Sequence, residues 1–168
     1  MQIDRLINIL VSIVVIAGVP LFFVQQYYEY NRTRVGKTID FAMLLQSADF
    51  KNARYNTLKP WLDQPLEAFQ AAHPPEAIRE KFVRDVVATN KEIFPALFEI
   101  NEFFNSLGVC VESGACDADV ADKQFGEFAK GIHCLYGIIY NDMKRKYLLD
   151  GFGQKIKYFA EKNGFCTQ

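Results

Sequence analysis

The sequence predicts an all-α protein in which one N-terminal transmembrane helix precedes a small helical bundle domain. Three observations predict this fold: an uncharged apolar run near the N-terminus, apolar residues that recur at steps of three or four, and few turn signals. The chain has 168 residues, of which 50% are hydrophobic, and a formal net charge of −1. These values indicate a folded domain rather than a disordered chain, and they give no electrostatic reason to expect nucleic-acid binding.

The apolar run covers residues 6–24, which carry no charged side chain. A helix of this length spans about 28 Å, close to the hydrocarbon thickness of a bilayer. Tyr27, Tyr28 and Tyr30 follow the run, as in the aromatic belt at a membrane interface. A barely basic N-terminus disfavours a cleaved signal peptide, and the length of the run disfavours a buried core helix. We therefore expect a retained anchor in residues 1–30 and a helical domain in residues 31–168.

Helices are expected along the rest of the chain, at residues 38–48, 49–61, 65–72, 75–107, 120–147 and 154–162. The first of these could continue the N-terminal helix, because only Gly36 interrupts the sequence between them. In residues 75–107 apolar side chains recur every three or four positions, which is the amphipathic pattern. Pro95 is expected to kink or split this helix and Gly108 to end it. Asp117 or Asp119 can cap the helix that follows.

The charges on either side of the apolar run predict its orientation. Arg32, Arg34 and Lys37 follow the run, whereas Arg5 in front of it is offset by Asp4. The positive-inside rule then places the C-terminal domain in the cytoplasm and the protein in the inner membrane of the cell as a single-pass protein.

Four cysteines, Cys110, Cys116, Cys134 and Cys166, have a spacing that matches no zinc-binding pattern. In an oxidising compartment such as the periplasm, Cys110 and Cys116 could form a local disulfide across a short turn, and Cys134 could pair with Cys166. In the cytoplasm all four would be free thiols, with Cys134 buried. The predicted topology favours free thiols.

Carboxylates cluster at Glu99 and Glu102 and again at Asp117, Asp119 and Asp122. Di-iron bundles combine such glutamates with Glu-x-x-His motifs, but the matching histidines are absent here. The aspartates lack the spaced glycine and terminal glutamate of a calcium loop, and helix capping explains them more simply. The sequence therefore predicts no catalytic residue, no metal site and no cofactor, and we do not expect an enzyme.

Residues 97–146 contain an aromatic and glutamate-bearing helix, a glycine turn, an acidic helix start and a helix that ends in basic residues. The features that carry this pattern are Phe98, Glu99, Phe103, Gly108, Asp119, Phe125, Gly126 and Arg145. With the N-terminal helix, the arrangement resembles the bacterial domain-of-unknown-function family 4760, over about half the chain. The resemblance implies a membrane helix and an all-helical domain, and it implies no catalytic residues.

The function expected from the sequence is that of an accessory subunit or interaction module of a membrane complex. Its partners would be membrane lipid and either another membrane protein or a second copy of the chain, and not nucleic acid. Contacts with a partner helix are expected at Asn8, Ser12, Ala17 and Gly18. A docking surface is expected at Trp61, Glu99, Glu102 and Asp119. The alternatives are an immunity or anti-phage membrane sensor, and a metal- or thiol-dependent protein that uses the cysteines and the acidic cluster.

Overall fold

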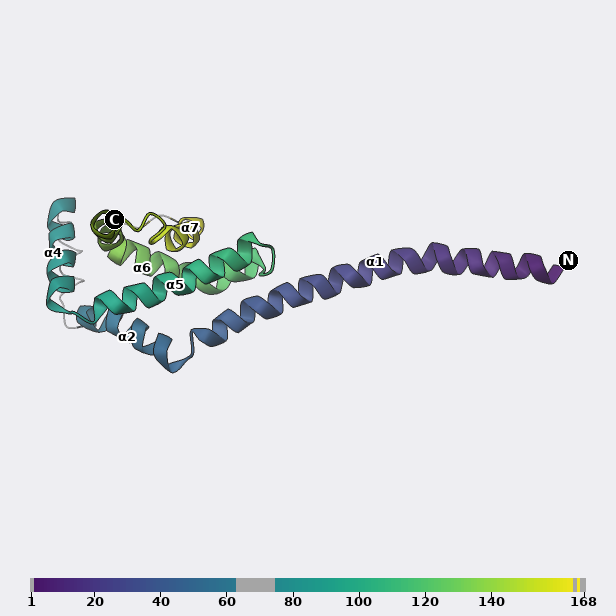
Figure 1. Cartoon of the computed structure of the whole chain (residues 1–168), viewed down its shortest axis with the longest axis horizontal. Helices are drawn as coiled ribbons and strands as arrows, with labels where there is room; N and C mark the ends of the chain where they lie inside the picture. The colour runs from purple at the N-terminus through teal and green to yellow at the C-terminus, as the bar shows by residue number, and fades with distance from the viewer. Residues whose placement is uncertain (1, 63–74, 165, 167–168) are drawn as a thin grey trace.

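The computed structural model describes residues 2–62, 75–164 and 166, with side chains described from residue 20 onward. Within these residues all regular secondary structure is helical, with no strand, which confirms the predicted all-α class. The helix α1 (Gln2–Leu44) extends away from a domain that contains all the other helices, and we call this domain the head (Figure 1). The helix expected at residues 65–72 lies outside the described residues.

The structure contradicts the transmembrane helix predicted for residues 6–24. In the part of the chain that is described, no helix contains a stretch both long and apolar enough to cross a membrane. A spanning helix needs about 20 consecutive apolar residues. The described side chains of α1 begin at Pro20, and only residues 21–24 are apolar before polar and charged residues follow. The side chains of residues 6–19 lie outside the described part.

One continuous helix replaces two predicted ones at the N-terminus. The segment expected as a separate helix at residues 38–48 forms the end of α1, which passes through Gly36 without a break. The helix α2 (Ala48–Leu62) follows after a tight turn in which the backbone N–H of Ser47 donates to the carbonyl of Leu44. Its position agrees with the helix predicted at residues 49–61.

The helix predicted at residues 75–107 is split in two, but the break does not fall at Pro95. The helix α4 (Glu76–Thr89) has its C-cap at Asn90, and α5 (Ile93–Glu112) begins three residues after this cap. Pro95 therefore lies in the first turn of α5, where its missing N–H has no helical partner to lose. Gly108 does not end α5, which continues to Glu112.

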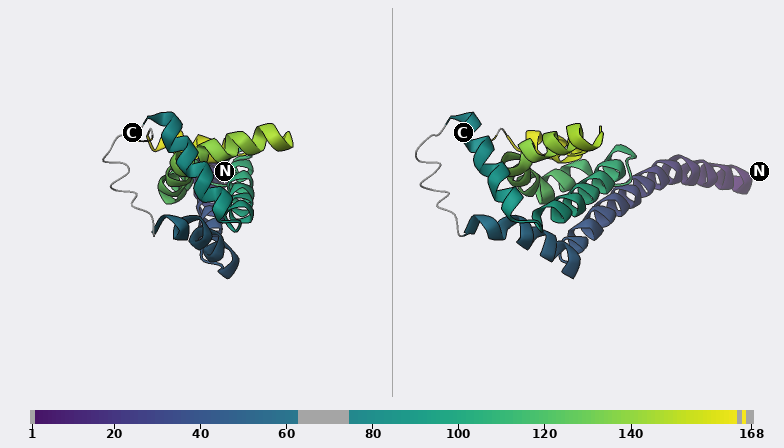
Figure 2. Two further views of the ribbon diagram at one scale, coloured as in Figure 1. Left: turned by 90° about the vertical axis from the view of Figure 1, so that its left-hand side faces the viewer. Right: turned by 60° about the vertical axis from the view of Figure 1, so that its left-hand side comes forward.

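The longest helix of the head, α6 (Ala118–Tyr147), begins at a side-chain cap. The carboxylate of Asp117 accepts hydrogen bonds from the backbone N–H groups of Asp119 and Val120, which confirms one of the two predicted caps. A short break follows, and α7 (Gln154–Lys162) then folds back on α6 and α5 (Figure 2). Gly153, at a φ of 76°, makes the reversal possible because glycine tolerates this conformation.

Aromatic rings bring the elements of the head together. The ring of Phe103 on α5 lies 4.9 Å from that of Phe50 on α2, 5.5 Å from that of Phe125 on α6 and 5.8 Å from that of Phe41 on α1. Phe104, also on α5, contacts Phe159 of α7. Burial of rings of this size is the main source of apolar stabilisation in such a core.

All four cysteines are paired, so the expectation of free thiols is wrong for this structure. One disulfide joins Cys110 and Cys116, across the turn between α5 and α6. The other joins Cys134, in the middle of α6, to Cys166, beyond the end of α7. Cys134 is exposed rather than buried, on a face of α6 that the apolar core does not cover.

Candidate functional site

The first candidate region is the junction between α1 and the head. The hydroxyl of Tyr30 donates to the carbonyl of Gly114 at 3.2 Å, and the guanidinium of Arg34 donates to the carbonyl of Cys116 at 3.3 and 3.4 Å. The Thr38 hydroxyl, which is buried, accepts the backbone N–H of Asp117 at 2.9 Å. Three side chains on successive turns of α1 therefore bind the backbone of one short turn, residues 113–117.

The second candidate region is residues 21–30 of α1, which we call the apolar segment and which ends at the junction residue Tyr30. Its large apolar side chains are between 51% and 69% exposed, and they are Leu21, Phe22, Phe23, Val24, Tyr27, Tyr28 and Tyr30. Soluble surfaces rarely carry such a run of exposed rings unless it is an interaction site. The apolar segment is thus the most prominent candidate contact surface in the described chain.

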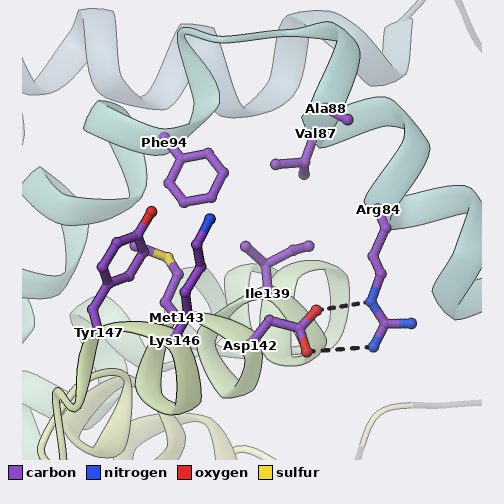
Figure 3. Close-up of a pocket in the computed structure, with 9 residues that line it drawn as sticks. All are labelled: Arg84, Val87, Ala88, Phe94, Ile139, Asp142, Met143, Lys146 and Tyr147. Carbon is purple, nitrogen blue, oxygen red and sulfur yellow. Dashed lines mark hydrogen bonds and ion pairs between the residues drawn. The ribbon is translucent and has the colours of Figure 1, made fainter.

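The third candidate region is a pocket of about 180 Å³ between α4 and α6 (Figure 3). Its apolar walls come from Val87 and Ala88 of α4, Phe94 of α5, and Ile139 and Met143 of α6. The pocket is smaller than the cavities that usually hold a drug-sized ligand.

A salt bridge closes one side of this pocket. Arg84 of α4 donates to both carboxylate oxygens of Asp142 on α6, at 2.7 and 3.4 Å (Figure 3). This hydrogen bond raises the pKa of the Arg84 guanidinium, which stays charged. Lys146 and Tyr147 line the opposite side, and the Lys146 ammonium lies over the Tyr147 ring. The Arg84–Asp142 salt bridge thus fastens α4 to α6 beside the pocket.

The predicted acidic docking residues remain on the surface but do not converge. Glu99 and Glu102 are exposed one turn apart on α5, and Asp119 is exposed at the start of α6. Among the described residues, no group of three or more His, Cys, Asp or Glu side chains is placed to hold a metal ion. Every cysteine of the head is in a disulfide, so the described residues contain no free thiol.

Trp61 is not part of a docking surface, because it is only 7% exposed. Its indole N–H donates to the Tyr136 hydroxyl at 2.5 Å, and that hydroxyl donates to the carbonyl of Thr57 at 2.5 Å. Burial raises the pKa of Tyr136 to about 12 and also raises the pKa of Tyr140. The polar atom of the tryptophan is thus satisfied inside the core, which explains how this residue can be buried.

The remaining predicted contact residues, Asn8, Ser12, Ala17 and Gly18, lie on α1, but their side chains are outside the described part of the chain. Sequence reasoning missed the junction residues Tyr30, Arg34 and Thr38. It placed Tyr30 in an interfacial belt and Arg34 among charges that set membrane orientation. One local feature of the sequence could have pointed to the junction, namely the predicted helix start at Asp117. A helix start beside a short turn leaves backbone groups unpaired, and another element can bind them.

The chain matches no protein-family model, and no curated protein or solved structure is significantly similar to it. The resemblance of residues 97–146 to family 4760 therefore stays a prediction.

Proposed function

We propose that this protein is a non-enzymatic interaction module that contacts lipid through the apolar segment of α1 and presents its head as an accessory unit beside a membrane complex. The observation that carries this proposal is the exposure of the large side chains in residues 21–30. Burial of these side chains would supply a large apolar driving force for attachment.

Helix geometry favours lipid over a single partner helix. Consecutive helical residues point about 100° apart, so the four exposed side chains at residues 21–24 cover all sides of α1. One packed helix covers only one side, whereas the lipids of a bilayer interface can contact several sides of the helix end that lies in it. Tyr27 and Tyr28 then place hydroxyl groups where apolar and polar layers meet. The exposed Arg32 and Lys37 follow at the level of anionic headgroups.

The two disulfides support an oxidising compartment for the head. Cysteines persist as disulfides in the periplasm and outside cells, and they are kept reduced in the cytosol. Cys110–Cys116 and Cys134–Cys166 both lie in the head. The proposal therefore places the head on the non-cytoplasmic side of the membrane, in place of the cytoplasmic side favoured by the charges of α1.

Vesicle flotation tests this proposal. The oxidised full-length protein is mixed with vesicles of phosphatidylethanolamine and phosphatidylglycerol and centrifuged through a density gradient. We expect it to float with the vesicles. Substitution of Phe22, Phe23, Tyr27 and Tyr28 by glutamine, which preserves helix propensity, should reduce flotation to background.

The matched control changes an equally exposed apolar surface of the head. Tyr55, Leu58 and Leu62 are exposed on α2, and their substitution by glutamine should leave flotation unchanged. The lipid proposal is overturned if the protein does not float, or if the glutamine variant of the apolar segment floats as well as the wild type. A stoichiometric protein partner recovered without lipid, and lost in the same variant, would replace lipid by a protein host.

A further inference from the structure

The contact between α1 and the head depends on the shape of one turn. Tyr30 and Arg34 donate to backbone carbonyls of this turn, and Thr38 accepts a backbone N–H from it. A weaker ion pair joins Arg34 to Asp117 at 3.9 Å. The groups that α1 binds are thus mainly backbone groups, whose positions are set by the conformation of residues 113–117.

The Cys110–Cys116 disulfide encloses this turn. Within the enclosed loop the N–H groups of Ala115 and Cys116 both donate to the carbonyl of Cys110, and Gly114 adopts a φ of 71°. The disulfide and these hydrogen bonds together point the carbonyls of Gly114 and Cys116 toward α1. The two cysteines differ in accessibility, because Cys116 is completely buried and Cys110 is partly exposed.

We propose that Cys110–Cys116 is a thiol–disulfide exchange site that responds to a dithiol reductant, and that its opening releases residues 30–38 of α1 from the head. A thiolate of the dithiol attacks the sulfur of Cys110, the disulfide breaks, and Cys116 leaves as a thiolate that takes up a proton. The second thiol of the reagent then attacks the mixed disulfide. The reagent leaves as its own disulfide, and Cys110 is released and protonated.

Opening the disulfide removes the covalent restraint on the turn, so its carbonyls no longer stay aligned with the donors of α1. The contact between Phe41 and Phe103, one turn beyond Thr38, does not involve the turn. The inner end of α1 therefore stays attached through this ring pair while residues 30–38 detach. The inference concerns the junction alone and does not depend on lipid binding by the apolar segment.

Hydrogen–deuterium exchange tests this proposal on the full-length protein. In a Cys134→Ser/Cys166→Ser variant, Cys110–Cys116 is the only disulfide that dithiothreitol can reduce. We expect the oxidised variant to protect residues 30–38 as the wild type does. After reduction, verified by alkylation of two thiols, the backbone N–H of Asp117, which donates to Thr38, should exchange faster. Residues 30–38 should lose the part of their protection that packing against the head provides, while peptides of α5 and α6 keep theirs.

A second variant separates the turn from the reductant. Cys110→Ser/Cys116→Ser retains the other disulfide and should show the same faster exchange at Asp117 and residues 30–38 with or without dithiothreitol. Unchanged protection of residues 30–38 after complete reduction overturns the proposal. Loss of protection throughout α5 and α6 also overturns it, because the disulfide would then be a cross-link for the whole head.

Discussion

At the scale of single residues, the buried hydroxyl of Tyr136 affects both the packing of two helices and the titration of its own side chain. It accepts from Trp61 and donates to the Thr57 carbonyl, and so it joins α6 to α2 through polar atoms inside an apolar core. Buried polar groups are tolerated only when they are hydrogen-bonded in this way. The same burial disfavours the phenolate, which raises the pKa of Tyr136 to about 12.

This shift in pKa predicts that the protein loses stability at alkaline pH. In the unfolded chain the tyrosine releases its proton near pH 10, before the folded state does. Above that pH the unfolded state binds fewer protons, so the free energy of unfolding falls as the pH rises from about 10 to about 12, by up to roughly 1.4 kcal/mol per unit for one group. Urea denaturation at a series of pH values measures this slope.

Tyr136→Phe provides the comparison for the alkaline slope. The raised pKa of Tyr140 remains in this variant, so the slope should become shallower without disappearing. An identical slope in the variant and the wild type would show that Tyr136 does not titrate in this range.

Local residue patterns predicted the contacts between residues that are close in sequence. They missed the contacts between residues that are far apart in sequence. The cap at Asp117 was predictable because its partners, Asp119 and Val120, are two and three residues away. The burial of Trp61 was not, because its partner Tyr136 is 75 residues away. For a similar reason, the sequence did not decide between disulfides and free thiols, since the spacing of the cysteines allows a disulfide without requiring one.

At the scale of elements, two glycines of α6 have opposite environments. A Cβ added to Gly126 would lie 1.8 Å from the side-chain amide of Asn163, which follows α7 and donates to the carbonyl of Phe159. A Cβ on Gly131 would meet nothing within 4 Å. Gly126 thus allows α7 to approach α6 closely, whereas Gly131 serves no visible packing role.

Alanine substitutions should therefore change stability in opposite directions. Gly126→Ala forces the Asn163 side chain away from α6, and this cost exceeds the gain in helix propensity, so the free energy of unfolding should fall by up to about 2 kcal/mol. Gly131→Ala should raise it by roughly 0.5–1 kcal/mol, because alanine has the higher helix propensity. Thermal and urea unfolding measure both variants. A stabilising Gly126→Ala would mean that Asn163 is not packed there in solution.

The positions of the described helices could largely be predicted from apolar periodicity, but several of their ends could not. Pro95 and Gly108 are residues that break helices in many contexts, and both lie within α5. Pro95 is tolerated because it is in the first turn, and Gly108 packs against the Lys155 side chain of α7. Local sequence does not determine in which turn of a helix a residue will lie. It also does not determine which distant helix will pack against that residue.

At the scale of the whole molecule, the disulfides stabilise loops of different length. Cys134–Cys166 closes a loop with a sequence separation of 32 and Cys110–Cys116 one of 6. The longer loop loses more conformational entropy in the unfolded state, and this restraint is worth about 3–4 kcal/mol against about 2 kcal/mol for the shorter one. Cys134→Ser/Cys166→Ser should therefore destabilise the head more than Cys110→Ser/Cys116→Ser.

Urea denaturation of the two double-serine variants under non-reducing conditions measures this difference. The wild-type protein in the same buffer gives the reference. The reverse order would indicate that native-state packing around the turn, and not loop entropy, dominates the effect of the shorter disulfide.

The way in which α1 and the head are joined was the feature least predictable from the sequence. The sequence predicted an anchor and a domain, whereas the structure has one continuous helix that belongs to both regions. The junction could not be foreseen, because Arg34 and Thr38 bind backbone groups that carry no side-chain signature. The exposed apolar segment was visible in the sequence, but the long helix that carries it was not.

The length of α1 has a mechanical consequence. Residues 2–29 extend beyond the junction as a single helix, a distance of about 42 Å at 1.5 Å per residue (Figure 1). If this helix turns by about 10° at its base, its far end travels roughly 7 Å. The helix therefore acts as a lever arm, and the stiffness of a few hydrogen bonds at Tyr30, Arg34 and Thr38 sets how wide a volume its far end can sweep.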